Sequence, residues 1–417
     1  MPPQRFSLRL AHIADLHLGA GYSHGDEDKG GVNSRLVDFR AAWVRSCRQM
    51  VDADVDLVAL AGDAFDTAKP TPTEMAAFRA GLNVLCDANI PMVAVVGNHD
   101  LPKATGRTDA VEIFDGWRSL VRVVSQPTMI DWEFPETNPD GSYTVVEHLP
   151  VAVFPWPTRA WMAARCENWD TMDMDTQHQK MVDESLKALW GLGAQAQQAA
   201  GPLGSILVGH MPISGSVVGA EQSTSFLREP VLPLPELRGL PFRYQAWGHL
   251  HKAQELEPHI RYAGAIERTD FAEEIEDKGW WLVDLTEDGV RTEWCSSSPR
   301  PFLTIELPDP TAWEGTLSML AGFLPGAVVR VRYQATPEVA RTVDHGGIRR
   351  ALYAAGAVKV HGPFAQIEHV VTRLENPVDE ETSPLAGWRA WGRLQGYDTT
   401  QLERLDRKVV EALEVLA

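Results

Sequence analysis

The chain has 417 residues, 44% of them hydrophobic and 23% charged, which is enough for two or three globular domains. Its net charge of −19 excludes a protein that binds nucleic acid through overall positive charge. Any contact with DNA must then come from a local groove, a dimer or a partner subunit. No run of about eighteen apolar residues occurs, which excludes a transmembrane helix, and we expect no membrane partner.

Further features predict a cytoplasmic protein, associated with the nucleoid if the host is bacterial. Segment 1–18 has no apolar core or cleavage site, so we expect no signal peptide. The four cysteines stand singly, without the paired spacing of a zinc site, and are typical of a reduced protein. No Gly-x-x-x-x-Gly-Lys-Ser/Thr loop occurs, so any use of ATP would require another subunit.

Short apolar runs alternate with amphipathic stretches in the first part of the chain. The apolar runs are 8–14, 56–61, 91–96 and 205–208. Runs rich in Val, Leu and Ile and closed by Gly are typical of strands buried on both faces. The stretches between them carry apolar stripes at helical spacing: Leu36, Phe39, Trp43, Cys47 and Met50; Met75, Phe78, Leu82 and Leu85; and a third helix over 178–200. Thr73 is a candidate N-cap. The alternation predicts an α/β layered fold.

The second stripe has two interpretations. Together with Val111 and Phe114 it could pack against the sheet of its own chain, or it could form the surface of a dimer. An amphipathic pattern does not name its partner, so the sequence leaves both open.

The turn-rich segment 294–301 predicts a domain boundary. We expect a first domain over 1–298, a small α/β capping domain over 299–375 and a helical tail over 376–417. The capping domain is predicted from these elements: a strand at Phe302–Leu307, a helix at Ala312–Phe323, a strand at Val328–Tyr333, a helix near Ile348–Ala355 and strands across Val358–Val371. The last helix of the tail carries an apolar stripe: Leu402, Leu405, Val409, Leu413 and Leu416.

Five clusters of metal-binding side chains recur in a fixed order, four of them directly after the predicted strands. They are Asp15-Leu16-His17, Gly62-Asp63-Ala64-Phe65-Asp66, Gly97-Asn98-His99-Asp100, Gly209-His210 and Gly248-His249-Leu250-His251. Each cluster alone is more often an ordinary turn or a hydrogen-bonded histidine. Five in order provide enough oxygen and nitrogen ligands for two divalent ions. This pattern predicts a binuclear phosphoester hydrolase whose site lies at the carboxyl ends of the strands.

The ligands divide into two sets that share one carboxylate. Two ions about 3.5–4 Å apart can polarise a phosphoryl group and deprotonate a water between them. We expect Asp63 to bridge the ions, since one carboxylate can span both. The other ligands would be Asp15, His17 and His251 for one ion, and Asn98, His210 and His249 for the other. In extended backbone, the spacing of Asp15 and His17, and of His249 and His251, would direct both members of each pair to one face.

His99 lies beside a ligand but is predicted not to be one. From that position it could stabilise the transition state or protonate the leaving oxygen. We expect the carboxylate of Asp66 to accept a hydrogen bond from His99 and to fix its tautomer. The remaining histidines, such as His12, His24 and His345, are expected to be structural.

These clusters resemble those of the calcineurin-like metallophosphoesterases, and within that superfamily the SbcD nucleases. The more specific matches are Asp15-Leu16-His17-Leu18-Gly19, Gly62-Asp63-Ala64-Phe65-Asp66-Thr67, Gly248-His249-Leu250-His251-Lys252 and Arg261–Phe271 followed by Lys278-Gly279-Trp280. The similarity extends over about residues 7–372. Ala265-Ile266 departs from the Ser-Pro that many members have after the preceding glycine, which affects the shape of a loop and not the metal ligands.

The resemblance implies an αββα sandwich with a small capping domain. It also implies two manganese ions, with magnesium as the alternative, a 3′→5′ exonuclease and endonuclease activity on duplex ends, hairpins and single strands, and a homodimer. The helical tail would dock on an SMC-type ATPase similar to SbcC, although such a stripe also packs within its own chain.

Basic side chains near the clusters are candidate phosphate contacts, although ordinary solvation is the simpler explanation for any one of them. They are Lys69, Lys103, Arg107, Arg159 and Arg268. Two other functions remain open: a phosphodiesterase or phosphatase for small nucleotides or phosphoproteins, and an idle scaffold that only bridges DNA or partners. The absence of Arg-Gly after the second cluster disfavours a protein phosphatase, and the intact ligand set disfavours the scaffold.

Overall fold

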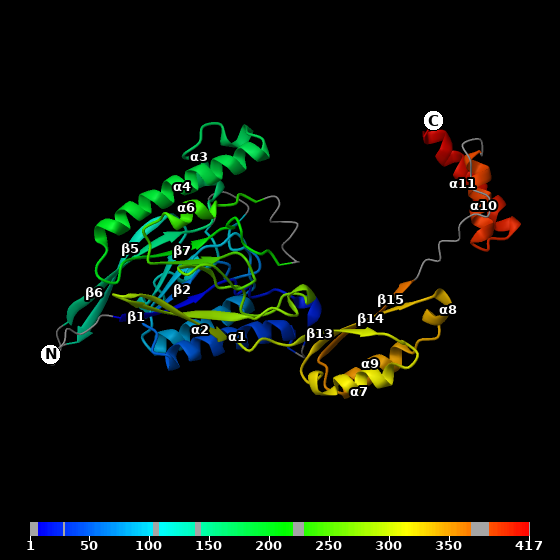
Figure 1. Ribbon diagram of the computed structural model, residues 1–417, viewed down its shortest axis with the longest axis horizontal. Helices are drawn as coiled ribbons and strands as arrows, with labels where there is room; N and C mark the ends of the chain where they lie inside the picture. The colour runs from blue at the N-terminus through cyan, green and yellow to red at the C-terminus, as the bar shows by residue number, and fades with distance from the viewer. Residues whose placement is uncertain are drawn as a thin grey trace.

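Two six-stranded sheets stacked face to face form the body of the molecule (Figure 1). This computed structural model describes residues 7–27, 30–102, 108–137, 143–219, 229–367 and 383–416. The first sheet has the strand order β12-β11-β1-β2-β3-β4 and the second the order β5-β6-β7-β8-β10-β9. Strands β1 to β4 are parallel to one another, as are β6, β7, β8 and β10, while the other pairs are antiparallel.

The bounds of the strands in the first sheet are β1 Ser7–Ile13, β2 Leu57–Leu60, β3 Met92–Val95, β4 Val121–Val124, β11 Gly279–Thr286 and β12 Gly289–Ser296. Those in the second sheet are β5 Thr128–Thr137, β6 Tyr143–Phe154, β7 Ile206–His210, β8 Tyr244–Gly248, β9 Gln254–Glu257 and β10 Ile260–Tyr262. The predicted apolar runs thus become four central strands of the two sheets.

Side chains alternate between two cores along each central strand. On β2, Leu57 and Ala59 lie in the core between the sheets, whereas Val58 and Leu60 face the helices outside. Both faces of the sheet are therefore buried, which explains why these strands are continuously apolar instead of alternating with polar residues. The outer layers complete an αββα sandwich and confirm the predicted fold class.

Helices cover the outer face of each sheet (Figure 1). They are α1 Ser34–Asp52 and α2 Pro72–Asp87 on the first sheet, with α3 Arg159–Ala163, α4 Met174–Ala199 and α6 Leu234–Arg238 on the side of the second. Short 3-10 turns lie between them: η1 Tyr22–His24, η2 Glu112–Phe114, η3 Trp117–Ser119, η4 Trp169–Thr171 and η5 Phe271–Glu273. The predicted cap of α2 at Thr73 is wrong by two residues. Thr71 caps the helix and forms a capping box with Glu74, because Pro72 fits the first helical position.

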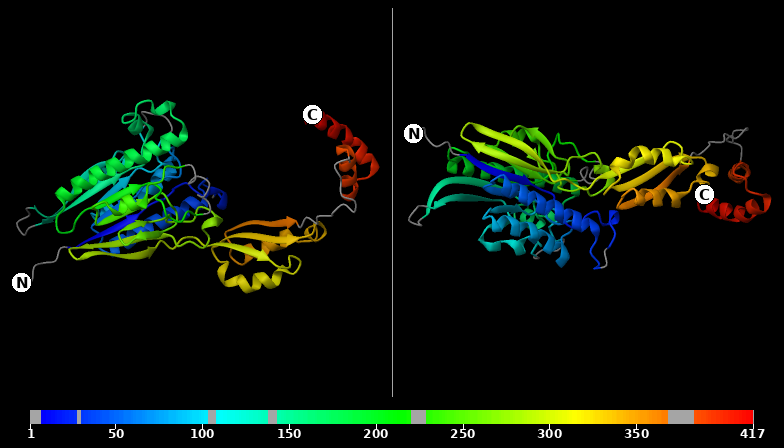
Figure 2. Two further views of the ribbon diagram at one scale, coloured as in Figure 1. Left: turned by 45° about the horizontal axis from the view of Figure 1, so that its top comes forward. Right: turned by 90° about the horizontal axis from the view of Figure 1, so that it is seen from below.

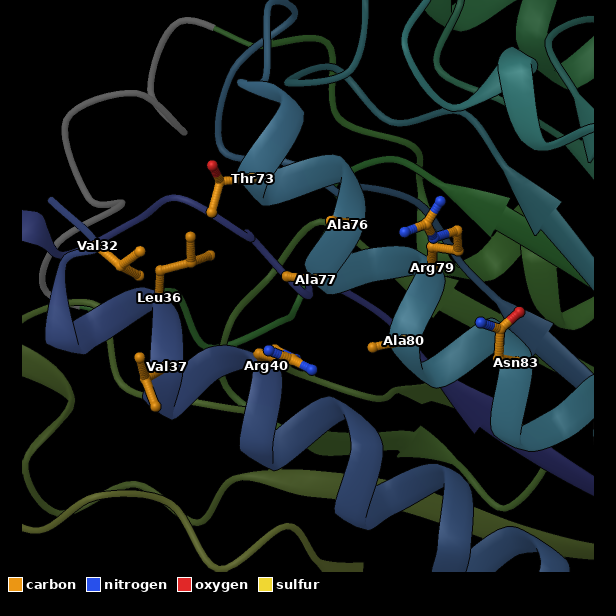
Figure 3. A pocket seen from close by; sticks show the side chains of 10 residues that line it. All are labelled: Val32, Leu36, Val37, Arg40, Thr73, Ala76, Ala77, Arg79, Ala80 and Asn83. Carbon is orange, nitrogen blue, oxygen red and sulfur yellow. The ribbon is translucent and has the colours of Figure 1, made fainter. Parts of the chain in front are cut away.

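The stripe on α2 is part of the core. Phe78, Leu82 and Leu85 are buried against the first sheet, as are Val111 and Phe114. These side chains cannot form a dimer surface, so core packing is the correct interpretation. Outward, α1 and α2 instead present the groove in Figure 3, with a volume of about 330 Å³. Its lining is mostly small or apolar, with two arginines: Val32, Leu36, Val37, Arg40, Thr73, Ala76, Ala77, Arg79, Ala80 and Asn83.

A separate three-stranded parallel sheet, in the order β13-β14-β15, stands beside the body (Figure 2). Its elements are β13 Phe302–Leu307, α7 Trp313–Leu320, η6 Ala321–Phe323, β14 Val328–Ala335, α8 Pro337–Ala340, α9 His345–Ala354 and β15 Lys359–Ile367. Helices α7 and α9 pack on one face and form a core of their own. The predicted strands across Val358–Val371 begin as one strand, and the residues after Ile367 lie outside the described part of the chain.

Two helices, α10 Pro384–Leu394 and α11 Thr399–Leu416, form the tail. The two helices pack on each other (Figure 1). Leu402 is buried, and Arg389 pairs with Asp406. The side chains of Leu413 and Leu416 lie outside the described set. Among the described residues, no helix is both long enough and apolar enough to cross a lipid bilayer.

Candidate metal centre

The predicted ligands meet where the central strands of the two sheets end. Five of the positions directly follow or close a strand: Asp15 and Asp63 lie just after β1 and β2, Asn98 after β3, His210 at the end of β7 and His249 after β8. Neighbouring parallel strands share one carboxyl edge, so their terminal loops converge there. The tertiary fold then brings the edges of the two sheets together.

Short distances connect the predicted ligands in a continuous chain. The Nε2 atoms of His251 and His17 lie 3.0 Å apart, and His17 Nε2 lies 3.6 Å from Asp63 Oδ2. The same carboxylate oxygen lies 3.2 Å from His210 Nε2. Asn98 Oδ1 lies 2.9 Å from His210 Nε2 and 3.0 Å from His249 Nδ1.

Asp15 lies on the other side of this chain of contacts. Its carboxylate accepts a hydrogen bond from the backbone amide of His249 at 3.0 Å, and it lies 4.0 Å from His210 Nδ1. The structure therefore brings together all seven predicted ligands, and Asp63 is the residue common to both groups of potential metal-binding atoms.

Outer hydrogen bonds determine which ring nitrogen of His210, His251 and His249 faces inward. His210 Nδ1 donates to the carbonyl of Ala61 at 2.7 Å, and His251 Nδ1 donates to Glu273 at 2.7 Å. His249 differs, because its Nε2 donates to Glu229 at 2.8 Å and its Nδ1 faces Asn98. The inner ring nitrogens of His210 and His249 therefore face oxygens of Asp63 and Asn98. Nitrogen and oxygen atoms that converge in this way suit a cation between them.

Four of the seven predicted ligands have positive φ angles and are not extended as predicted. Asp15, His17 and Asp63 have φ angles of 50°, 39° and 52°, and His249 has φ 107°. The prediction that extended backbone aligns Asp15 with His17, and His249 with His251, is therefore wrong, although the side chains of both pairs do enter the same site. Such angles cost about 1–3 kcal/mol each for residues with a side chain and are concentrated at functional sites.

Two glycines are required because backbone and side chains approach closely. A Cβ atom on Gly97 would lie 2.1 Å from Asp63 Oδ1, and one on Gly248 would lie 1.9 Å from the carbonyl oxygen of Ala61. Any side chain at these positions would displace the loops that hold Asp63 and His249.

The electrostatics of the cluster favour positive charge. Burial alone would lower the pKa of His210, but the carboxylates of Asp63 and Asp15 outweigh burial and raise it to about 9. Burial raises the pKa of Asp15 to about 7, against the opposing effect of His210. Burial lowers the pKa of His17 to about 4, so this ring is neutral and able to act as a ligand. The residues present thus fit divalent cations. In the predicted division, Asp15, His17, Asp63 and His251 would hold one ion, and Asp63, Asn98, His210 and His249 would hold the other.

His99 lies at the exposed rim of the cluster, with its ring 4.7 Å from the ring of His17. Its Nδ1 donates to the backbone carbonyl of Asp66 at 2.8 Å. The prediction that the Asp66 carboxylate accepts from His99 is corrected, because that carboxylate lies 3.5 Å from His17 Nδ1 instead. The tautomer of His99 is still fixed by Asp66, but by its backbone carbonyl and not by its carboxylate. Atoms of His99, His17 and Asp63 lie close enough together to hold an ion, so proximity alone does not exclude His99 as a ligand.

Several supporting residues were missed by sequence reasoning. The buried carboxylate of Asp100 accepts from the amides of Ala64, Phe65 and Gly97, at 3.3, 3.1 and 3.0 Å, and so joins two ligand loops. The position of Asp100 directly after His99 was the sequence feature that could have revealed this role. Nothing in the sequence singled out Glu229 or Trp156, whose ring lies 5.3 Å from that of His249.

The basic side chains proposed for DNA have different environments. Lys69 is exposed, and Arg159 is exposed and paired with Asp170. Arg268 is not available, because its guanidinium donates to the carbonyls of Glu273, Glu276 and Arg300. Lys103 and Arg107 lie outside the described residues.

Comparison with known families agrees with this geometry. The profile of the family described as Calcineurin-like phosphoesterase matches residues 8–253, which contain every predicted ligand. The chain belongs to the calcineurin-like phosphoesterase family. Membership of this family identifies the chain as a metal-dependent phosphoesterase.

Relatives of this phosphoesterase include DNA repair proteins. It is 26% identical to the DNA double-strand break repair protein Mre11 of Haloferax volcanii over 191 residues, or 41% of each chain. It is 23% identical to SbcD, a component of the nuclease SbcCD of Bacillus subtilis, over 304 residues, or 71% of each chain. The match to the Mre11 protein thus spans less than half of that relative. Among solved structures, the Plasmodium protein titled "GAP50 the anchor in the inner membrane complex" is 17% identical with a TM-score of 0.39, covering 70% of this chain and 85% of the other.

Proposed function

We propose that this phosphoesterase is the nuclease component of a DNA-break-processing complex and hydrolyses DNA phosphodiesters with two manganese ions. The observation that carries the proposal is the position of Asp63 between the imidazoles of His17 and His210, at 3.6 and 3.2 Å. A carboxylate shared by two sets of nitrogen and oxygen ligands suits a pair of divalent ions. The names of the relatives, a break repair protein and a component of a nuclease, support DNA as the substrate.

The ions, when bound, would polarise the phosphoryl group and acidify a water. The chain itself contributes the proton chemistry at the rim. Because His99 Nδ1 donates to the Asp66 carbonyl, the second ring nitrogen is the one that can carry a transferable proton. In its charged form, His99 would give this proton to the leaving oxygen or stabilise the negative charge that develops there.

The proposal includes the properties that the resemblance to SbcD implies. These are 3′→5′ exonuclease and endonuclease action, an SMC-type ATPase partner, a homodimer and a cytoplasmic location. Light scattering in solution tests the dimer, and co-purification with an SMC-type ATPase of the same host tests the partner.

The deciding experiment is hydrolysis of end-labelled linear duplex DNA with manganese by the wild type and by His99→Ser. We expect digestion by the wild type and its loss in His99→Ser, with two ions still bound by the variant. The matched control is His148→Ser, which alters an exposed histidine on β6 that pairs with Asp131 outside the centre. This control should digest DNA at the wild-type rate.

The other outcomes separate the alternatives. If duplex, hairpin and single-stranded DNA all stay intact while bis-p-nitrophenyl phosphate is cleaved, the substrate is smaller or the ATPase is required, and adding the ATPase distinguishes these cases. If no phosphodiester is cleaved although two ions bind, the chain is a scaffold and the proposal is wrong.

A further inference from the structure

The segment between β10 and β11, residues 263–278, has no role in the proposed function, yet it connects a proposed ligand to the small sheet. We refer to it as the strap. It contains most of the stretch that resembles SbcD proteins outside the ligand clusters, and it includes η5. One side of the strap contacts His251, and the other contacts β13 and β14.

On the side of the metal centre, Glu273 holds the ring of His251. Its Oε1 accepts from His251 Nδ1 at 2.7 Å, which leaves Nε2 facing His17. Its Oε2 accepts from the backbone amide of Thr269 at 2.7 Å and lies 3.2 Å from Lys278 Nζ. The Glu273 and Lys278 side chains are fully buried, so water does not compete for these contacts.

Lys278 holds the same histidine by its main chain. Its ammonium donates to the carbonyl of His251 at 3.0 Å, and the amide of Ala265 donates to that carbonyl at 3.0 Å. The ring and the backbone of His251 are therefore both attached to the strap. A second carboxylate, Glu229, contacts His249 in a comparable way, but it lies outside the strap.

On the side of the small sheet, two residues of the strap next to Glu273 pack on β13 and β14. Phe271 lies 4.9 Å from the ring of Phe302, and the guanidinium of Arg330 lies 4.4 Å above its ring. The carboxylate of Glu274 accepts from the amide and hydroxyl of Thr304, at 2.7 and 2.6 Å. Glu273 thus lies between two residues whose positions depend on the small sheet.

A network of charges fixes the base of the strap. The carboxylate of Glu267, which is buried, accepts from the amides of Arg268 and Arg300 and from the guanidinium of Arg35. Arg300 also pairs with Asp38 on α1. These contacts join α1, the strap and the segment that leads into β13, so the strap is attached to both parts.

We propose that Glu273 is a positioning residue that orients His251 for one metal ion. We further propose that the packing of the strap against the small sheet determines this orientation. The proposal rests on the proposed function, because it assumes that His251 is a ligand. It assigns to the small sheet an effect on metal affinity that is transmitted through the strap. Carboxylates that hold metal-binding histidines generally change affinity by about 10–100-fold when they are removed.

Glu273→Gln is the informative variant because it has the same shape. A glutamine offers one oxygen and one amide group, whereas Glu273 faces donors on both sides: His251 Nδ1 on one, Thr269 and Lys278 on the other. Either orientation of the amide leaves an N–H group facing another donor. The ring of His251 therefore loses its fixed tautomer or the strap shifts.

The experiment is calorimetric titration of the full-length, metal-free protein with Mn²⁺. We expect one of the two binding steps to weaken by about 10–100-fold in Glu273→Gln and the other step to change less. Tyr244→Phe is the matched control, since it removes an equally buried hydrogen bond to a histidine, His12, that is not a proposed ligand. This control should leave both steps unchanged.

Failure of the proposal and failure of the proposed function are distinguishable. A wild type that binds no Mn²⁺ contradicts the metal centre itself. A wild type that binds two ions, together with a folded Glu273→Gln that binds both with unchanged affinity, overturns only the role of Glu273. If Glu273→Gln does not fold, Glu273→Asp replaces it, because the shorter carboxylate keeps the charge but withdraws from His251.

The contribution of the small sheet is tested by Phe302→Ala, which alters neither the strap nor a ligand. We expect the same binding step to weaken, by at least about 3-fold, because Phe271 and η5 lose the aromatic ring on which they pack. The affinity should recover in Phe302→Leu, which restores apolar contact with Phe271. Unchanged affinity in a folded Phe302→Ala would overturn the link to the small sheet.

Discussion

His210 Nε2 lies 3.2 Å from Asp63 Oδ2, and both side chains are buried at the ends of strands that belong to different sheets. Buried contacts of this kind are costly unless charge is compensated. The pKa of His210 is raised to about 9, against the effect of burial, because the carboxylates of Asp63 and Asp15 stabilise its charged form. A proton on His210 Nε2 and a divalent cation therefore compete for the same position between this nitrogen and Asp63 Oδ2.

Asp63→Asn should remove this competition and the metal centre together. The pKa of His210 in the metal-free variant should fall below about 9, because the larger of its two stabilising carboxylates is lost. The number of bound Mn²⁺ ions should fall from two to one or none. Proton NMR titration and calorimetry measure the two quantities. Two ions bound with wild-type affinity would contradict a bridging role for Asp63.

Gly97→Ala should abolish metal binding although it replaces none of the proposed ligands. The new Cβ would lie 2.1 Å from Asp63 Oδ1, so the carboxylate or its loop must move. Gly191→Ala in α4 is the control, because no atom lies within 4 Å of its Cβ, and it should stabilise the helix by up to about 1 kcal/mol. Mn²⁺ titration and thermal unfolding test both variants. Retention of two bound ions by Gly97→Ala would show that the close approach is not needed.

Asp100→Asn should reduce stability by about 1–3 kcal/mol, because an amide group replaces a carboxylate oxygen that faces backbone N–H donors. These donors belong to Ala64, Phe65 and Gly97. Urea unfolding of the metal-free protein measures the effect, with the exposed Asp52→Asn as control. An unchanged free energy of unfolding would mean that Asp100 does not tie the two loops together.

His12 should make the protein less stable in acid. Burial lowers the pKa of His12 from 6.5 to about 3, and its ring bonds Tyr244 and the carbonyl of Trp247. Between these two pH values the unfolded chain binds a proton at His12 and the folded chain does not. The stabilisation from the neutral, buried His12 is therefore complete above pH 6.5 and is lost as the pH falls toward 3.

The measurement is the free energy of unfolding of the metal-free protein at pH 7 and pH 5, in the wild type and in His12→Gln. The drop between these values should be smaller in the variant, whose residue 12 does not titrate. An equal drop in both proteins would contradict a buried neutral His12.

Local patterns predicted most elements, and they singled out the residues that the fold brings together at the proposed metal centre. The apolar runs before Asp15, Asp63, Asn98 and His210 became central strands, because burial on both faces demands continuous apolar sequence. The predictions were wrong or incomplete where two neighbouring residues, or two packing partners, fit the same local pattern. Thr71 and Thr73 both suit an N-cap, and Pro72 decided between them. Whether the α2 stripe faces its own sheet or a second chain depends on packing that the pattern does not encode.

The sequence by itself determined the chemistry of the site, because residue type and order along consecutive strands are local information. Only the tertiary structure decided how those residues are held. His17 and His251 are 234 positions apart, and their outer partners, such as Asp66 and Glu273, come from other loops. Which ring nitrogen faces inward, which carboxylate supports it and how the small sheet reaches the centre all follow from packing between distant segments. Such contacts produce no repeating pattern in the sequence, because each depends on a single residue at a single position.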